Sequence, residues 1–119
     1  METRKLYENL GEDYDEVLSR FGSDLMVGRF ALRFLDDPSF ENLTKGLDDN
    51  DAEKAFRGAH TLKGLCATLG FDKLSKKASA LTESLRPRVI TDEADPLYDA
   101  TKEEYDKVIA ALKEFKEQR

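Results

Sequence analysis

Apolar residues recur at helical spacing along most of the chain, and glycines and prolines fall mainly between these stretches. The period-two alternation bounded by hairpin turns that is typical of β-strands is not found in the sequence. The clearest amphipathic stripe repeats in steps of three and four residues until Pro87 ends it, and consists of Phe71, Leu74, Ala78, Leu81 and Leu85. The pattern therefore predicts an all-α domain.

The first part of the chain predicts two short helices and a longer one. The short helices are expected over about residues 3–10 and 14–21, where apolar residues share one helical face. Residues 24–35 are apolar around most of a helix circumference, so this third helix is expected to be largely buried. Arg29 and Arg33 mark its solvent side.

Capping signals predict where the following helices begin and end. Asp37 as N-cap and Pro38 at the first helical position open a short helix to about residue 47. Asn50 with Glu53 resembles a capping box, which opens a helix to about residue 69. Gly70 then suits a left-handed C-cap.

A last helix is expected to begin at Asp95-Pro96 and to turn its apolar residues toward the core. Long helices joined by short loops predict an antiparallel four-helix bundle with one or two additional short N-terminal helices. We expect a single domain over residues 1–119, with cap helices in 1–22 and the bundle in 23–118.

Composition and charge narrow the classes of function. The chain has 119 residues and a formal net charge of -6, which argues against a nucleic-acid or anionic-membrane binder. No secretory signal and no long apolar run is seen, so a cytoplasmic location is expected. The single cysteine, Cys66, agrees with a reducing compartment and lies on a core face, where a buried apolar filler is expected. A monomer is expected because no surplus apolar stripe is left after the bundle is filled.

The single histidine, His60, is predicted to face solvent. Taking 3.6 residues per turn, it lies roughly 160° to 180° from the middle of the apolar face of its helix. That face consists of Ala55, Gly58, Ala59, Leu62, Leu65, Cys66 and Leu69. Its helical neighbours on the exposed side are Phe56, Arg57, Lys63, Gly64 and Ala67.

These neighbours suit an imidazole that carries phosphate for a docked protein. Histidine is partly neutral and nucleophilic near neutral pH, and Lys63, with Arg57 on the preceding turn, places positive charge near a phosphoryl oxygen. Gly64 and Ala67 leave the surface flat, so that a partner's active site can approach. Close helix packing is an alternative reason for a mid-helix glycine.

An apolar docking centre is expected beside the histidine. Phe56, together with Phe34 on the adjacent helix, is the candidate for this centre, and Arg29 and Arg33 are further candidate docking residues. Burial of Phe56 under a neighbouring helix is the plainer alternative. For His60 itself, the plainer alternative is an ordinary surface residue.

The run from Ala59 to Gly70 resembles the signature of histidine phosphotransfer domains, His-x-x-Lys-Gly followed by small residues and Leu-Gly. The likeness extends over roughly residues 24–88. It implies a helical bundle in which His60 is the phosphoacceptor, Lys63 supports the phosphate and Gly64 gives clearance.

The same resemblance implies the partners. The phosphoryl group is expected to come from an aspartyl phosphate on a response-regulator receiver domain, as in a hybrid sensor kinase, and to leave to another receiver. Mg²⁺ is then expected on the receiver, with no metal or cofactor held by this chain. The protein is expected to be a phosphocarrier and not an enzyme, because no phosphate-binding loop for ATP is present.

Three other functions remain open. The chain resembles the phosphoacceptor domain of a chemotaxis-type kinase, but it lacks the dimerisation and ATP-binding domains of such kinases, so a free-standing carrier is expected. A helical adaptor would leave His60 chemically idle. An enzyme with His60 as general base is disfavoured because no carboxylate lies one turn away to orient the ring.

Overall fold

The computed structural model describes residues 2–119, and every regular element in this range is helical. The elements are α1 (Thr3–Leu10), α2 (Tyr14–Phe21), α3 (Asp24–Arg33), the short 3₁₀-helix η1 (Phe34–Asp36), α4 (Ser39–Asp48), α5 (Ala52–Leu69), α6 (Asp72–Leu85) and α7 (Ala94–Glu117). The expected all-α fold is confirmed.

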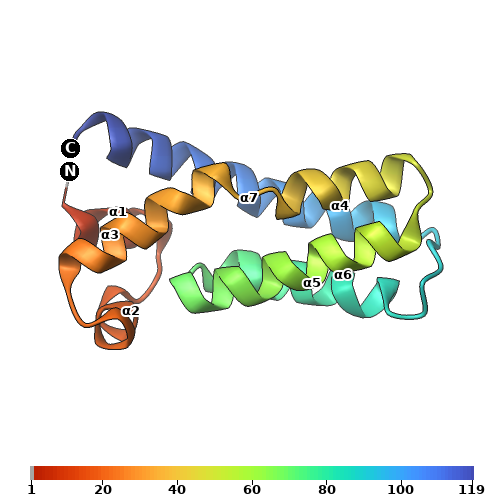
Figure 1. Ribbon diagram of the computed structural model, residues 1–119, viewed down its shortest axis with the longest axis horizontal. Helices are drawn as coiled ribbons and strands as arrows, with labels where there is room; N and C mark the ends of the chain where they lie inside the picture. Colours follow the sequence, from red (N-terminus) through yellow and green to blue (C-terminus); the bar gives the residue numbers. More distant parts are fainter. Residues whose placement is uncertain (1) are drawn as a thin grey trace.

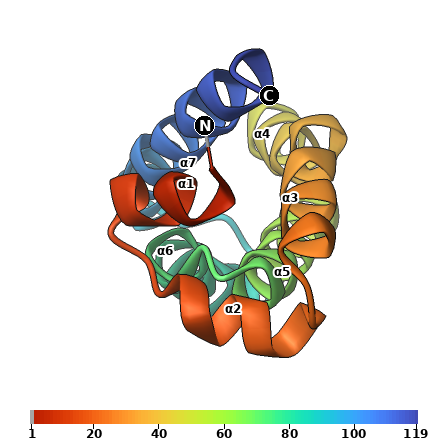
Figure 2. The ribbon, with the colours of Figure 1, turned by 90° about the vertical axis from the view of Figure 1, so that its left-hand side faces the viewer.

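The helices form an elongated molecule of 41 × 25 × 19 Å. At one end α4, α5, α6 and α7 lie side by side, with α4 on α5, α5 on α6 and α6 on α7 (Figure 1). At the other end α1 packs on α7, and α2 contacts both α1 and α3. Viewed along the molecule, the helices surround a common interior (Figure 2).

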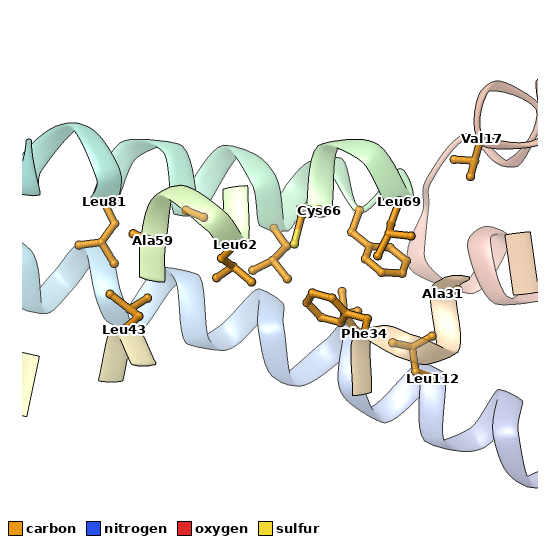
Figure 3. Close-up of a cluster of buried hydrophobic side chains, with 14 of the residues drawn as sticks. Val17, Ala31, Phe34, Leu43, Ala59, Leu62, Cys66, Leu69, Leu81 and Leu112 are labelled. Atoms are coloured by element: carbon orange, nitrogen blue, oxygen red, sulfur yellow. The ribbon is translucent and has the colours of Figure 1, made fainter. Parts of the chain in front are cut away.

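One apolar core runs through this interior, and both ends of the molecule contribute to it. Leu62 and Cys66 of α5 point into this core, and Phe34 of η1 lies between Cys66 and Leu112 of α7 (Figure 3). Tyr7 of α1 is also fully buried, and its ring stacks on Phe71 at 5.7 Å between centroids. The N-terminal helices therefore complete the core.

The predicted start of α5 was misplaced, for a local reason. Asp51, not Asn50, caps α5 by accepting from the backbone N–H of Lys54 at 3.1 Å. Asn50 instead adopts φ 53° in the tight turn after α4, a conformation that asparagine tolerates. The Glu53 carboxylate binds arginines and takes no part in a capping box.

Proline shifts the two other starts by one or two residues. The Asp37 carboxylate does accept from the backbone N–H of Ser39 at 3.0 Å, but Pro38 lies before α4 and not inside it. The last helix begins at Ala94, so Pro96 occupies its first turn. A missing N–H costs nothing there, because the first turn has no intrahelical acceptor.

The prediction of a largely buried helix over 24–35 is wrong for part of its surface. Val27, Gly28 and Ala31 are buried, whereas Leu25 is 59% exposed. Phe30 and Leu32 are half-buried at the edge of the core, so α3 is covered over only part of its circumference. Arg29 and Arg33 are exposed, as expected.

Candidate functional site

His60 lies on the exposed face of α5, as predicted. The opposite face of the helix, formed by Ala55, Gly58, Ala59, Leu62, Cys66 and Leu69, is buried. Arg57, Gly64 and Ala67 are also exposed, and Lys63 is half-buried. α5 therefore presents the imidazole with the predicted neighbours on a single surface.

Gly64 leaves open space beside His60. A Cβ atom added at Gly64 would meet no atom within 4 Å outside its own helix backbone and chain neighbours. At Gly58 the same addition would lie 2.6 Å from the backbone nitrogen of Leu43 in α4. Close helix packing thus explains Gly58 but not Gly64.

Lys63 keeps its ammonium group available. Its backbone carbonyl accepts from the Ser75 hydroxyl of α6 at 2.9 Å, which ties this turn of α5 to the neighbouring helix. Within residues 2–119, no ion pair engages the Lys63 ammonium. After the bond to Arg86, the charge of Lys63 contributes to lowering the pKa of the Glu83 carboxyl group, but within this range no hydrogen bond to the ammonium has to be broken for it to meet an incoming anion.

The expected exposure of Phe56 is wrong, because the turn between α6 and α7 folds over it. Phe56 is only 7% exposed. The Arg88 guanidinium carbon lies 3.6 Å from the centre of the Phe56 ring, and that of Arg86 lies 5.5 Å away. On the side of His60, the two rings are nearly parallel at 12°, with centroids 5.8 Å apart. Phe56 is thus a covered neighbour of the imidazole and not an exposed docking centre.

The expectation for Phe34 is also wrong. Phe34 is 1% exposed and belongs to the core, where its ring contacts Phe71 edge-on at 5.5 Å and lies 5.8 Å from Tyr105. The 3₁₀ turn that follows α3 directs this side chain inward. It therefore offers a partner almost no surface.

The sequence analysis missed a cluster of paired charges beside the histidine. Glu53 accepts from Arg57 at 2.9 Å and from Arg88 at 2.8 Å, and these arginines, Arg88 first, lower the pKa of its carboxyl group. Arg86 is held by Glu83 at 2.8 Å. The Arg-Pro-Arg sequence at 86–88 is visible in the chain, but only the tertiary fold brings it to α5.

Of the two arginines of α3, only Arg33 borders the hollow beside α5. Arg33 lies with its guanidinium carbon 4.9 Å from the centre of the Phe30 ring. It borders an apolar hollow lined by Phe21, Phe30 and Leu65, next to α5. Both Arg29 and Arg33 border another hollow, beside Lys116 and Arg119 at the end of α7. Arg33 is therefore the one that lies near the helix of His60.

Other chemistry in the described range is limited. Cys66 is buried, and burial raises the pKa of its thiol. No group of three potential metal-ligating side chains comes together in residues 2–119. His60 contacts Phe56, and no carboxylate in this range bonds to its ring. Among these helices, none is both long and apolar enough to cross a membrane.

Comparison with known proteins agrees with this geometry. A family model described as Hpt domain matches residues 31–115, a range that contains η1 and α4–α6 in full together with most of α7. The matched residues include His60, Lys63 and Gly64. No curated protein and no solved structure matched the chain.

Proposed function

The chain belongs to the family of Hpt domains, which take part in histidine phosphotransfer in phosphorelays, and we propose that His60 is its phosphoacceptor. In this proposal His60 receives a phosphoryl group from a receiver-domain aspartate and passes it to a second receiver. The observation that supports it most directly is the exposed imidazole of His60 beside open space at Gly64.

The transfer needs little from this chain beyond placement of the nucleophile. The unprotonated imidazole nitrogen attacks phosphorus as the bond to the aspartyl oxygen breaks, which frees the aspartate carboxylate and forms phosphohistidine. Lys63 offsets negative charge on the phosphoryl oxygens. Mg²⁺ and the acidic residues that hold it belong to the receiver in this scheme.

The receiver is proposed to dock over the exposed face of α5. Arg57 and Ala67 flank His60 on this face, and Arg33 borders the apolar hollow beside it. Arg29 borders the hollow at the end of α7, which Arg33 also lines, so transfer to Arg29→Ala tests whether the docking surface extends that far. The Asp-rich active site of a receiver complements these cations.

The remaining features follow from the same proposal. We take residues 23–118, which contain α3 to α7, as the antiparallel four-helix bundle, with α1 and α2 in residues 1–22 as its cap. The protein acts as a cytoplasmic monomer and receives its phosphoryl group from a hybrid sensor kinase. Sedimentation of the phosphorylated and unphosphorylated protein tests the monomer.

The deciding experiment is phosphotransfer from a panel of phosphorylated receiver domains, with Mg²⁺ present, to the wild type and to His60→Ala. We expect acid-labile, base-stable phosphate on the wild type alone. Circular dichroism of His60→Ala serves as the control for folding. Absence of label on the wild type from every donor would favour a helical adaptor. Labelling only by the ATP-bound catalytic core of a chemotaxis-type kinase would favour the kinase-domain alternative.

A further inference from the structure

Arg88 has an unusual backbone conformation next to the proposed site. It lies in the turn between α6 and α7 with φ 61°, in the left-handed region that few non-glycine residues adopt. Three hydrogen bonds hold it there: its N–H to the Leu85 carbonyl at 2.8 Å, its Nε to Glu53 at 2.8 Å and its Nη1 to the Arg86 carbonyl at 2.6 Å. A strained residue fixed by its surroundings is often part of a functional site.

The Arg88 guanidinium lies over the Phe56 ring, which in turn stacks on the ring of His60. Its carbon lies 3.6 Å from the centre of the Phe56 ring, within the range of a cation–π contact. Phe56 and His60 are one helical turn apart, and their rings are nearly parallel at 12°. Arg88 binds Glu53, one turn before Phe56, whereas His60 lies one turn after it.

We propose that Arg88, anchored on Glu53 and acting through the Phe56 ring, is a positioning residue that restricts the orientation of the His60 imidazole for phosphoryl transfer. The inference rests on the proposed function of His60. An imidazole on an open helix face would otherwise sample several rotamers. The parallel Phe56 ring, held in place by Arg88, limits the rotamers that the imidazole adopts. It thereby keeps the attacking nitrogen in line with the partner's phosphorus.

The two other arginines near this stack are less closely placed on the Phe56 ring. Arg86 lies farther from the Phe56 ring, at 5.5 Å, and is held by Glu83. Arg57 shares Glu53 with Arg88 but has no ring contact with Phe56. Arg88 is therefore the closer of the two cations that lie over the ring.

The test replaces Arg88 with asparagine, which tolerates the left-handed backbone while removing the guanidinium. Arg88→Lys keeps the charge but loses the planar group. Arg4→Gln is the matched control, because Arg4 also lies over an aromatic ring, at 4.7 Å from the centre of Tyr14, and binds a carboxylate, Asp15, at 2.8 Å. Glu53→Gln loosens the anchor without changing Arg88 itself.

Two measurements are made on each variant. Nitrogen-15 NMR of the His60 ring in the free protein reports the tautomer ratio and ring mobility. Single-turnover transfer is measured at several concentrations of a phosphorylated receiver. It gives the rate at saturation and, separately, the receiver concentration at half-saturation. For Arg88→Asn and Arg88→Lys we expect altered ring signals and a saturating rate lower by about three- to ten-fold, with little change in half-saturation. Glu53→Gln should change the ring signals and the saturating rate in the same direction as the Arg88 variants. Arg4→Gln should match the wild type.

Unchanged ring signals and rates in folded Arg88→Asn would overturn the inference. An effect on half-saturation alone would also overturn it, since that result means a docking contact and not positioning. A wild type that no receiver labels would refute the proposed function. The NMR comparison would then still decide, without any receiver, whether Arg88 orients the ring.

Discussion

At the scale of single residues, two glycines of α5 have opposite surroundings. A Cβ at Gly58 would lie 2.6 Å from the Leu43 nitrogen and 2.9 Å from the Ser39 carbonyl oxygen, both of them backbone atoms of α4. A Cβ at Gly64 would enter open space. The two positions therefore separate a glycine required for helix packing from one that leaves the surface clear.

We predict that alanine has opposite effects at the two sites. Gly64→Ala should raise the free energy of unfolding by about 0.5–1 kcal/mol, because alanine is the better helix former and nothing obstructs it. Gly58→Ala should lower it by about 1–3 kcal/mol, because α4 must move away. Urea denaturation of both variants checks this.

A bulky residue at position 64 tests whether phosphotransfer needs the open space beside His60. Gly64→Leu should leave the protein folded but reduce phosphotransfer, because the side chain would stand where the receiver approaches. If Gly64→Leu were labelled as fast as wild type, the proposed clearance would be wrong. If Gly64→Ala were destabilised, the surface there would not be open.

At the scale of elements, the N-terminal helices hold the C-terminal end of α5. Arg20 of α2 donates through Nη1 to the Ala67 carbonyl at 2.9 Å and also to the Thr68 carbonyl. The Tyr7 hydroxyl of α1 donates to the Leu69 carbonyl at 2.6 Å. The last carbonyls of a helix have no N–H donor within it. The Gly70 N–H reaches the Ala67 carbonyl at 3.3 Å, and Arg20 and Tyr7 supply donors to the carbonyls of Thr68 and Leu69.

Removing the guanidinium should loosen this end of the helix. We predict that Arg20→Met, which keeps the apolar stem, lowers the free energy of unfolding by about 1 kcal/mol. Amide hydrogen exchange should accelerate around Gly70 and Phe71, whose N–H groups bond to the last turn of α5. Lys45→Met, which removes only an exposed pair with Glu41, is the control. Unchanged exchange at residues 70 and 71 would show that Arg20 does not hold the helix end.

At the scale of the whole molecule, the helices before the matched Hpt range are part of the core. Leu6 and Tyr7 are fully buried and Val17 is 1% exposed. We predict that a chain beginning at Asp24 loses cooperative unfolding, because each buried side chain of this size contributes about 1.5–3 kcal/mol. Thermal melting followed by near-ultraviolet circular dichroism compares it with the full chain. An equal melting temperature would mean that α1 and α2 are dispensable.

Stability should also fall at alkaline pH. Burial is the main cause that raises the pKa of Tyr7, and burial followed by the bond to Asp24 raises that of Tyr14 to about 12. An unfolded tyrosine ionises near pH 10. The raised folded pKa therefore stabilises the protein below about pH 10, and this contribution is lost as pH rises through the folded value.

The measurement is the free energy of unfolding of wild type and Tyr7→Phe between pH 8 and 11. The advantage of wild type should shrink above about pH 10, by at most about 1.4 kcal/mol per pH unit, because phenylalanine cannot ionise. A difference that stays constant across this range would show that Tyr7 ionises alike in both states.

The sequence by itself determined the helices and the direction in which His60 points. The bounds of α1, α2 and α6, and the end of α5 at Leu69 before Gly70, follow from local periodicity and from glycine and proline. The exposure of His60 follows equally, because a residue opposite the buried face of a helix meets solvent. These properties depend on neighbours within one or two turns of the chain.

Only the tertiary structure decided what surrounds that histidine. Arg88 reaches Glu53 across 35 positions of sequence and covers Phe56, and Arg20 reaches α5 across 47. The turn after α3 likewise placed Phe34 in the core. Helical periodicity determines on which side of its own helix a residue lies, but not which distant segment packs there, because that choice is made by the packing of the whole chain.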